Sequence, residues 1–331
     1  MNKLGWIIIV CIGVALASAY YFLRTNSMEQ KNITWGVNFS QMQAEALQLN
    51  WKEMYLAMLR DLGVKKVKLV TQWDWVEGKQ DDFYFQDIDW QIAQAEHYGT
   101  QLIYVVGMKT GRWPECHLPT WAVGLSKEEQ QKKLLEYVEV MVRRYKGSPA
   151  VAFWQVENEP LFKFGECPWY DKEFLKKEVA LVKTLDPSRQ IIISDTGEAS
   201  LWFEAANIGD IVSATMYRTV WMHISKNLGF FFKWPLPPQF YGAKAMLIKK
   251  VFNKPVICGE LQAEPWVSRV FNEVPLEEQE KSMNLDLFKT NITYAKKTGL
   301  GEFYFWGVEW WYWLKEKQHK PDIWNEAKKL F

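Results

Sequence analysis

Two glutamates stand where the sequence predicts that buried strands end. Glu159 lies in the stretch "WQVENEP", and Glu260 closes the later stretch "KPVICGE". Because burying a charge costs several kcal/mol unless the charge is paired or used, both carboxylates need a purpose. A protonated carboxylic acid can give its proton to a leaving group, and an ionised carboxylate can attack carbon or activate water. The two glutamates are therefore a candidate acid and a candidate nucleophile, provided that the fold brings them together.

From Ile33 onward, short apolar segments alternate with amphipathic helical patterns. Segments that are apolar throughout and separated by helices predict a parallel sheet covered on both faces. Eight such units fit a single (β/α)8 TIM barrel over residues 28–331. The alternative, an open doubly wound sheet, needs a glycine-rich phosphate loop after its first strand, and "GVNFSQMQAE" is not such a loop. The eight expected strands are residues 33–39, 65–70, 101–107, 150–156, 190–194, 210–217, 254–260 and 302–307.

In a barrel of this kind the active site is built from the C-terminal ends of the strands. Glu159 and Glu260 then face one cavity from the fourth and seventh strands. Two such carboxylates are the groups that glycoside hydrolysis requires, about 5–5.5 Å apart for retention of anomeric configuration and roughly 6.5–9.5 Å apart for inversion. Polar residues at the other strand ends, which we expect to bind substrate, are Asn38, Lys68, Asn158 and Tyr217.

Two further carboxylates flank the candidate pair. Glu157 is expected to play a structural role by bonding a neighbouring cation such as Lys68 or Arg218. Glu264 follows the seventh strand and is expected to bind sugar hydroxyls or to lie at the rim of the cavity. Arg112 either pairs with a carboxylate across the mouth of the barrel or is a solvated loop charge.

The aromatic content is high, with 19 tryptophans and 16% aromatic residues. Flat, weakly polar rings on loops suit stacking against sugar rings, although many of these side chains must simply pack the core. Five tryptophans lie just after expected strands or in their loops, and we expect them to serve as sugar platforms: Trp73, Trp75, Trp113, Trp266 and Trp306.

The stretches "WQVENEP" and "KPVICGE" resemble the two signatures of clan A of the glycoside hydrolases. These are retaining enzymes on a (β/α)8 barrel, and they include the cellulase-like family five. The stretch "WDWVEGKQDDFYFQDIDWQIAQAEHYG" is similar to a strand-two signature of the same clan. The resemblance implies that Glu159 is the acid/base and Glu260 the nucleophile. It also implies that Asn158 holds the sugar 2-hydroxyl, that Tyr217 orients the nucleophile and that Trp306 lies beneath the reacting sugar.

The chain departs from the family-five pattern at several positions. Lys68 stands where cellulase-like members often carry an arginine, and Thr215 stands where family five often has a histidine. The stretch "LQAEPW" after Glu260 replaces the aromatic-glycine pair that is common in the clan. A less studied family of the same clan fits these residues.

The N-terminal residues 1–27 contain an uncharged apolar stretch from Leu4 to Leu23, which is long enough for a membrane-spanning helix. They predict either a cleaved signal peptide or an uncleaved anchor, with the globular part exported and either secreted or held at the membrane. Export permits a disulfide between the loop cysteines Cys116 and Cys167, and the sequence leaves that pairing open.

The net charge of +1 indicates no nucleic-acid partner. We expect a monomer that needs no cofactor and no metal, because the cysteines and histidines lack metal-ligand spacing.

The sequence therefore predicts a retaining β-glycoside hydrolase that acts on an oligo- or polysaccharide. Two alternatives remain: a carbohydrate-binding surface protein that has lost catalysis on the same barrel, and a transglycosylase that passes the glycosyl group to another sugar. The sugar itself is not predicted, because such barrels host many specificities.

Overall fold

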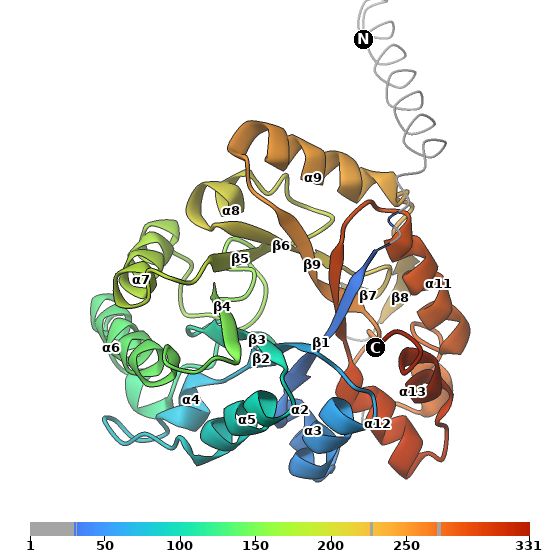
Figure 1. Ribbon diagram of the computed structural model, residues 1–331, viewed down its shortest axis with the longest axis horizontal. Helices are drawn as coiled ribbons and strands as arrows, with labels where there is room; N and C mark the ends of the chain where they lie inside the picture. Colours follow the sequence, from blue (N-terminus) through green and yellow to red (C-terminus); the bar gives the residue numbers. More distant parts are fainter. Residues whose placement is uncertain (1–29, 31, 226–227, 270–272) are drawn as a thin grey trace, which may run out of the picture.

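Eight parallel strands close into a barrel with the order β1-β10-β9-β6-β5-β4-β3-β2 (Figure 1). The computed structural model describes residues 30, 32–225, 228–269 and 273–331. The predicted (β/α)8 barrel is confirmed. The predicted N-terminal helix lies outside the described residues, and no helix within them is long and apolar enough to cross a bilayer. The barrel strands are β1 (Thr34–Ser40), β2 (Lys66–Val70), β3 (Gln101–Val106), β4 (Val151–Val156), β5 (Ile191–Asp195), β6 (Ile211–Met216), β9 (Val256–Gln262) and β10 (Glu302–Trp306).

The helices form an outer layer around the ring of strands (Figure 1). A capping box begins α6: the Ser126 side chain accepts from the Glu129 amide, and the Glu129 side chain accepts from the Ser126 amide. The helices are α2 (Gln41–Ala46), α3 (Trp51–Arg60), α4 (Trp73–Val76), α5 (Gln86–His97), α6 (Lys127–Tyr145), α7 (Lys172–Leu185), α8 (Phe203–Ile208), α9 (Gln239–Phe252), α10 (Leu276–Gln279), α11 (Leu285–Lys296), α12 (Val308–Lys317) and α13 (Asp322–Ala327), with a 3-10 turn at Thr120–Ala122.

The sequence pattern predicts one helix over about residues 42–62 and another over about residues 276–297, and the structure splits each of them in two. The first is divided between α2 and α3, where the Asn50 side chain accepts from the amides of Lys52 and Glu53 and so caps a new helix. The second is divided between α10 and α11, where the Asn284 side chain accepts from the amide of Leu287. In both cases an asparagine side chain accepts from free backbone amides and so begins a new helix. The apolar sequence pattern continues across the break, which is why it predicts a single helix.

The long apolar loop after β6 forms an antiparallel hairpin of β7 (Thr219–Ser225) and β8 (Leu228–Lys233). Gln262, the last residue of β9, holds its base. The Gln262 Oε1 atom accepts from the amides of Arg218 and Thr219 at 2.8 and 2.9 Å, and its Nε2 atom donates to the Thr219 carbonyl at 2.6 Å. The outer part of the hairpin leaves the apolar side chains of Met222, Ile224, Leu228 and Phe230 exposed.

The described residues form two larger apolar regions and a small cluster of Val70, Val105 and Trp306. A large cluster fills the space between the strands and the helices, and a smaller cluster of Ile103, Ile192, Ile211, Ile257 and Tyr304 fills the inside of the barrel. Gly36 of β1 makes room for the Tyr304 ring, because a Cβ atom at Gly36 would lie 2.7 Å from both that ring and the Lys66 carbonyl oxygen.

Replacing Gly36 with alanine is therefore expected to lower the free energy of unfolding by about 1–3 kcal/mol through overpacking. Urea denaturation followed by tryptophan fluorescence measures the change. Gly124→Ala is the matched control, because no atom lies within 4 Å of a Cβ at that position. Equal denaturation midpoints for the two variants would contradict the tight packing inside the barrel.

Candidate active site

Glu260 is buried at the C-terminal end of the barrel, and donors occupy both of its carboxylate oxygens. The Lys68 Nζ atom donates to its Oε1 atom at 2.7 Å, and the Tyr217 hydroxyl donates to its Oε2 atom at 2.7 Å. Lys68 is fully buried, so its ammonium group and this carboxylate compensate each other in charge. Two donors from two other strand ends thus fix the orientation of Glu260.

Glu159 is held differently. It follows β4 with a backbone φ of 43°, its amide donates to the Ser194 Oγ atom at 2.7 Å, and its Oε1 atom accepts from the Thr215 hydroxyl at 3.0 Å. Burial raises the pKa of Glu159 to about 8, and the negative charges of Glu260 and Glu115 add to the rise. Near neutral pH this side chain is therefore mainly a protonated acid.

Thr215 links the two glutamates. In the pairing of β6 with β9, Thr215 lies opposite Glu260, directly after a register shift that follows Ala214. Its hydroxyl group donates to the Glu159 carboxyl group. The fold therefore brings the fourth and seventh strand ends to one site, as the barrel prediction requires.

Asn158 joins the same network. Its Oδ1 atom accepts from the Lys68 Nζ atom at 3.0 Å and from the Gln155 Nε2 atom at 3.2 Å. The Trp306 ring lies 5.8 Å from the Lys68 Nζ atom and 4.2 Å from the Arg112 guanidinium carbon. The predicted residues Lys68, Asn158, Tyr217 and Trp306 thus gather around the two glutamates.

Arg112 and Glu264 are buried beside Trp306. Arg112 donates to Glu264 and, through its NH2 group, to the Glu309 Oε2 atom at 2.9 Å. Of the two possibilities for Arg112, the structure therefore shows the carboxylate pair. Glu264 is bonded within this triad rather than exposed at the rim. Burial raises the pKa of Glu309 to about 7, against the opposing effect of Arg112.

Glu115 is a carboxylate that sequence reasoning missed. Burial raises its pKa to about 7, and the charges of Lys109 and Glu260 act on it in opposite directions, so Glu115 lies within electrostatic reach of the site. It sits in an irregular loop after β3, where no periodicity indicates which side chains turn inward. The only local signal is its place directly before Cys116.

Glu157 supports the loop after β3. The prediction that it bonds a neighbouring cation such as Lys68 or Arg218 is wrong. Its two oxygens accept from the amides of Met108 and Lys109 at 2.9 and 2.5 Å, instead of from Lys68 or Arg218. Gly107, with a φ of 136°, makes this approach possible, because a Cβ atom there would lie 2.5 Å from the Glu157 carboxyl carbon. Burial raises the pKa of Glu157.

Two of the predicted substrate-binding residues, Trp73 and Asn38, are buried and hydrogen-bonded within the protein. The Trp73 ring is fully buried, stacks on Tyr137 at 5.6 Å and donates to the Glu77 Oε2 atom at 2.8 Å, so it belongs to the packing behind β2 and leaves no face for a sugar. The Asn38 Nδ2 atom donates to the carbonyls of Gly259 and Phe305 at 2.9 and 3.2 Å. Asn38 thus ties β1 to β9 and β10 next to Glu260, which is a positioning role.

Two other predicted platforms, Trp113 and Trp266, belong to a cluster of aromatic side chains. The Trp266 ring meets the Tyr217 ring edge-on at 4.8 Å, and both Trp266 and Trp113 lie close to Phe164, with ring centroids 6.1 and 6.3 Å away. Trp113 is 58% exposed, so its face is available to a ligand. These rings come from the loops after β3, β4 and β9, and Trp266 adjoins Tyr217, which donates to Glu260.

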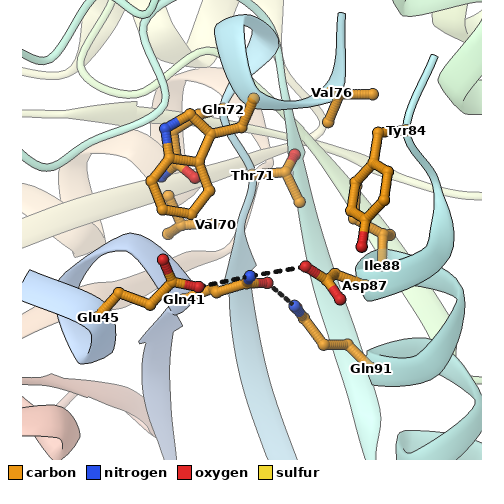
Figure 2. Close-up of a pocket in the computed structure, with 11 residues that line it drawn as sticks. Gln41, Glu45, Val70, Thr71, Gln72, Val76, Tyr84, Asp87, Ile88 and Gln91 are labelled. Carbon is orange, nitrogen blue, oxygen red and sulfur yellow. Dashed lines mark hydrogen bonds between the residues drawn. The ribbon is translucent and has the colours of Figure 1, made fainter. Parts of the chain in front are cut away.

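A pocket of about 400 Å³ opens beside the ends of β1 and β2 (Figure 2). Its lining includes Val70 and Gln72 from the end of β2, Gln41 from α2, and Asp87 and Gln91 from α5. In Figure 2 the side chains of Gln41, Asp87 and Gln91 meet in a row of hydrogen bonds.

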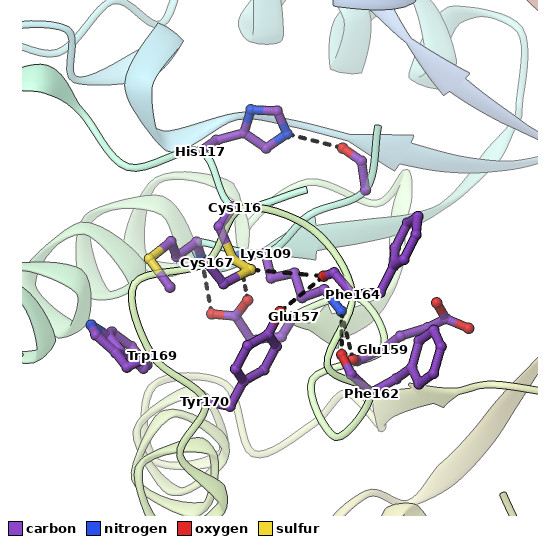
Figure 3. Close-up of a disulfide and its surroundings, with 12 residues drawn as sticks. Lys109, Cys116, His117, Glu157, Glu159, Phe162, Phe164, Cys167, Trp169 and Tyr170 are labelled. Atoms are coloured by element: carbon purple, nitrogen blue, oxygen red, sulfur yellow. Dashed lines mark hydrogen bonds between the residues drawn. A yellow bond between two sulfur atoms is a disulfide. The ribbon is translucent and has the colours of Figure 1, made fainter. Parts of the chain in front are cut away.

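A disulfide joins Cys116 and Cys167, and it fastens the loop after β3 to the loop after β4 (Figure 3). Lys109 adds a second connection, because its Nζ atom donates to the carbonyls of Glu159 and Phe162, each at 2.9 Å. The backbone that carries Glu159 is therefore held by the neighbouring loop as well as by its own strand.

Comparisons with known proteins agree with this geometry. Residues 92–274, more than half of the chain, match the family described as glycosyl hydrolases family 2, TIM barrel domain. Human beta-glucuronidase is 31% identical over 153 residues, covering 45% of this chain and 21% of that protein. Mannan endo-1,4-beta-mannosidase A of Emericella nidulans is 27% identical over 142 residues, covering 41% of this chain and 37% of that protein.

The chain thus aligns with only about a fifth to two fifths of the length of these relatives. Among solved structures, xylanase 10B from Thermotoga petrophila has a TM-score of 0.55 at 17% identity, covering 83% of this chain and 82% of that one, which shows a shared fold. The resemblance to clan A that the two glutamate stretches carry is confirmed, and the chain belongs to the glycosyl hydrolases of family 2 through their TIM barrel domain.

Proposed function

We propose that this protein is a retaining β-glycosidase in which Glu159 is the acid/base and Glu260 is the nucleophile, within a catalytic domain of residues 28–331. The observation that carries the proposal is the different environment of the two carboxyl groups. Glu260 has an ammonium group and a phenol on its two oxygens, whereas Glu159 has one neutral hydroxyl donor and a raised pKa. One site thereby pairs a carboxylate that is bonded to an ammonium group with a protonated acid, which is the combination that double displacement uses.

The proposed reaction has two steps. The Glu260 carboxylate attacks the anomeric carbon while Glu159 gives its proton to the departing glycosidic oxygen, so one bond forms and one breaks. Water then attacks the same carbon, Glu159 takes a proton from that water, and the bond to Glu260 breaks with release of the sugar. Trp306 lies beneath the reacting ring, and Asn158 is fixed by Lys68 to bond the hydroxyl next to the anomeric carbon.

The substrate class is an oligo- or polysaccharide. The relatives' names point to glucuronide and mannan linkages. A screen of the purified protein against aryl glycosides and polysaccharides identifies the sugar. The anomer that forms first, followed by proton NMR, tests retention, because a first product with the opposite configuration would contradict double displacement.

Changing Glu260 to Gln is expected to lower kcat by at least about a thousandfold, because the variant keeps the shape of the side chain and loses the attacking carboxylate. Initial rates on the best aryl glycoside measure the loss. Glu302→Gln, at the opposite end of the barrel, is the control and should keep near-normal rates. A Glu260→Gln variant with activity close to that of the natural protein would refute the assignment.

The pH dependence of kcat/KM tests the role of Glu159. A raised pKa means that the acid stays protonated up to about pH 8, so kcat/KM should fall as the pH rises through that value. The Thr215 hydroxyl lowers this pKa, so Thr215→Val should move the basic limb of the profile to higher pH. Thr100→Val removes a buried hydroxyl bonded to the Val64 carbonyl at the other end of the barrel, and it should leave the limb in place. An unmoved limb in Thr215→Val would contradict the role of Glu159.

We also propose that the globular part is exported and held at the membrane or secreted. The Cys116–Cys167 disulfide supports export, because disulfides persist in oxidising compartments.

Replacing Cys116 and Cys167 with serine is expected to lower the free energy of unfolding by about 2–4 kcal/mol, because the unfolded chain loses a cross-link. Urea denaturation of the natural protein with and without reductant should show the same decrease. The double variant is its own control, since reductant should no longer change its midpoint. A natural protein that is indifferent to reductant would argue against a structural disulfide.

A further inference from the structure

The apolar residues of the β7–β8 hairpin gather on one of its two faces. Val220, Met222 and Ile224 alternate along β7, and the strand register places Met222 opposite Phe230. Because successive side chains of a strand point to opposite faces, these residues share one face with Leu228 of β8. The exposed fraction rises from 8% at Val220 to 42% at Met222 and 65% at Ile224, and Leu228 and Phe230 are 57% and 48% exposed. The outer part of this face is therefore uncovered within the described part of the chain.

The other face of the hairpin is closed by its own rings. Trp221 lies opposite Phe231, and the two rings meet edge-on with centroids 5.0 Å apart. Within the described residues, β7 and β8 form a sheet of two strands. A hairpin of two strands is at best marginally stable on its own in water, and a contiguous exposed apolar patch marks a binding surface. We therefore expect a further surface to cover the apolar face.

The segment that contains the hairpin is basic. Residues 211–259 contain seven lysines and arginines and no aspartate or glutamate, although the whole chain has a net charge of only +1. Lys233 at the end of β8 and Lys249 and Lys250 in the last turn of α9 are exposed. Exposed apolar side chains together with lysines are typical of surfaces that bind anionic lipid.

The chain enters the barrel beside the base of the hairpin. The Gln30 amide donates to the Lys296 carbonyl at 2.9 Å, at the end of α11. The Tyr294 hydroxyl of the same helix donates at 2.7 Å to the carbonyl of Leu236, shortly after β8. The guanidinium carbon of Arg218, directly before β7, lies 3.7 Å from the centre of the Tyr294 ring. Both Gln30 and the hairpin therefore adjoin the last turn of α11, and Figure 1 shows the hairpin on the side of the barrel where α11 lies.

The length of chain before Gln30 makes a lipid surface the best candidate for the partner. The uncharged apolar stretch from Leu4 to Leu23, which is long enough to span a bilayer, ends seven residues before Gln30. Seven residues span at most about 25 Å when fully extended. A bilayer that holds this stretch therefore lies within about 25 Å of Gln30, near the side of the barrel that carries the hairpin.

We propose that the exposed apolar face of the hairpin, formed by Met222, Ile224, Leu228 and Phe230, docks on an anionic lipid surface. The apolar side chains enter the boundary between headgroups and acyl chains, and the neighbouring lysines bind the headgroups. The hairpin begins two residues after Tyr217, which donates to Glu260, so docking keeps the mouth of the barrel beside the membrane. The docking does not depend on the proposed glycosidase chemistry.

A dye at position 224 of the full chain tests the contact. Cys11→Ser and Ile224→Cys together leave one reactive thiol for a nitrobenzoxadiazole label, because Cys258 is buried and Cys116 and Cys167 are joined in the disulfide. The labelled chain is reconstituted into vesicles of phosphatidylcholine and phosphatidylglycerol, with and without doxyl-labelled lipid. We expect the doxyl lipid to lower the fluorescence by at least about twofold, because it quenches only a dye that touches lipid.

The matched control carries the label at Val123→Cys instead. Val123 is 63% exposed and belongs to the loop after β3, which lies across the barrel from β9 in the strand order. Its fluorescence should not respond to doxyl lipid. Adding Met222→Gln and Phe230→Gln to the chain labelled at position 224 should remove more than about half of the quenching, since these changes remove apolar surface.

Four results would count against the proposal. Equal responses to doxyl lipid at positions 224 and 123, or unchanged quenching after Met222→Gln and Phe230→Gln, would overturn docking through the apolar face. A dye at position 224 that is shielded from water but insensitive to doxyl lipid would show that a protein, such as a second copy of the chain, covers the face instead. Vesicles of phosphatidylcholine alone should give weaker quenching, and equal quenching in both lipids would overturn the choice of an anionic surface.

Discussion

The buried pair of Lys68 and Glu260 is the interaction on which the rest of the site depends. A fully buried ammonium group is stable only with an opposite charge and further acceptors, and here Glu260 and Asn158 supply them at 2.7 and 3.0 Å. Removing either charge would leave the other uncompensated. The pair therefore constrains the C-terminal ends of β2, β4 and β9 at once. A residue that shifts any of these strands along its own axis would also move the proposed nucleophile, Glu260.

The two proposed catalytic carboxyl groups gain different properties from their neighbours. Glu260 is matched by a cation and a phenol, whereas Glu159 is matched by a threonine hydroxyl and faces the negative charges of Glu260 and Glu115. Burial disfavours the charged form of any carboxylate that lacks a cation, so the pKa of Glu159 is raised. The same amino acid can thus serve as acid and as nucleophile, because only Glu260 has a lysine ammonium bonded to its carboxylate, whereas Lys109 bonds the backbone carbonyl of Glu159.

The loops after β3 and β4 keep this arrangement in place. Glu157 accepts from the backbone of the first loop, Lys109 donates to the backbone of the second, and the Cys116–Cys167 disulfide joins the two. Glu159 has a positive φ, a conformation that non-glycine residues adopt only when surrounding contacts enforce it. These contacts provide that enforcement.

The barrel and the places of its strand ends follow from the amino-acid pattern, because apolar segments of strand length alternate with helical periodicity and parallel strands end on one face. From that rule alone, Glu159, Glu260, Lys68, Asn158 and Tyr217 were expected at a single site, and the structure brings these side chains together. The directions in which several other side chains point, in contrast, depend on how distant segments pack. Trp73 faces the core behind β2, Asn38 bonds the backbone of β9 and β10, and Arg112 and Glu115 turn inward from a loop without periodicity. The disulfide and the pocket depend in the same way on segments distant in the chain, and the distance between such segments is set by packing, which no local pattern encodes.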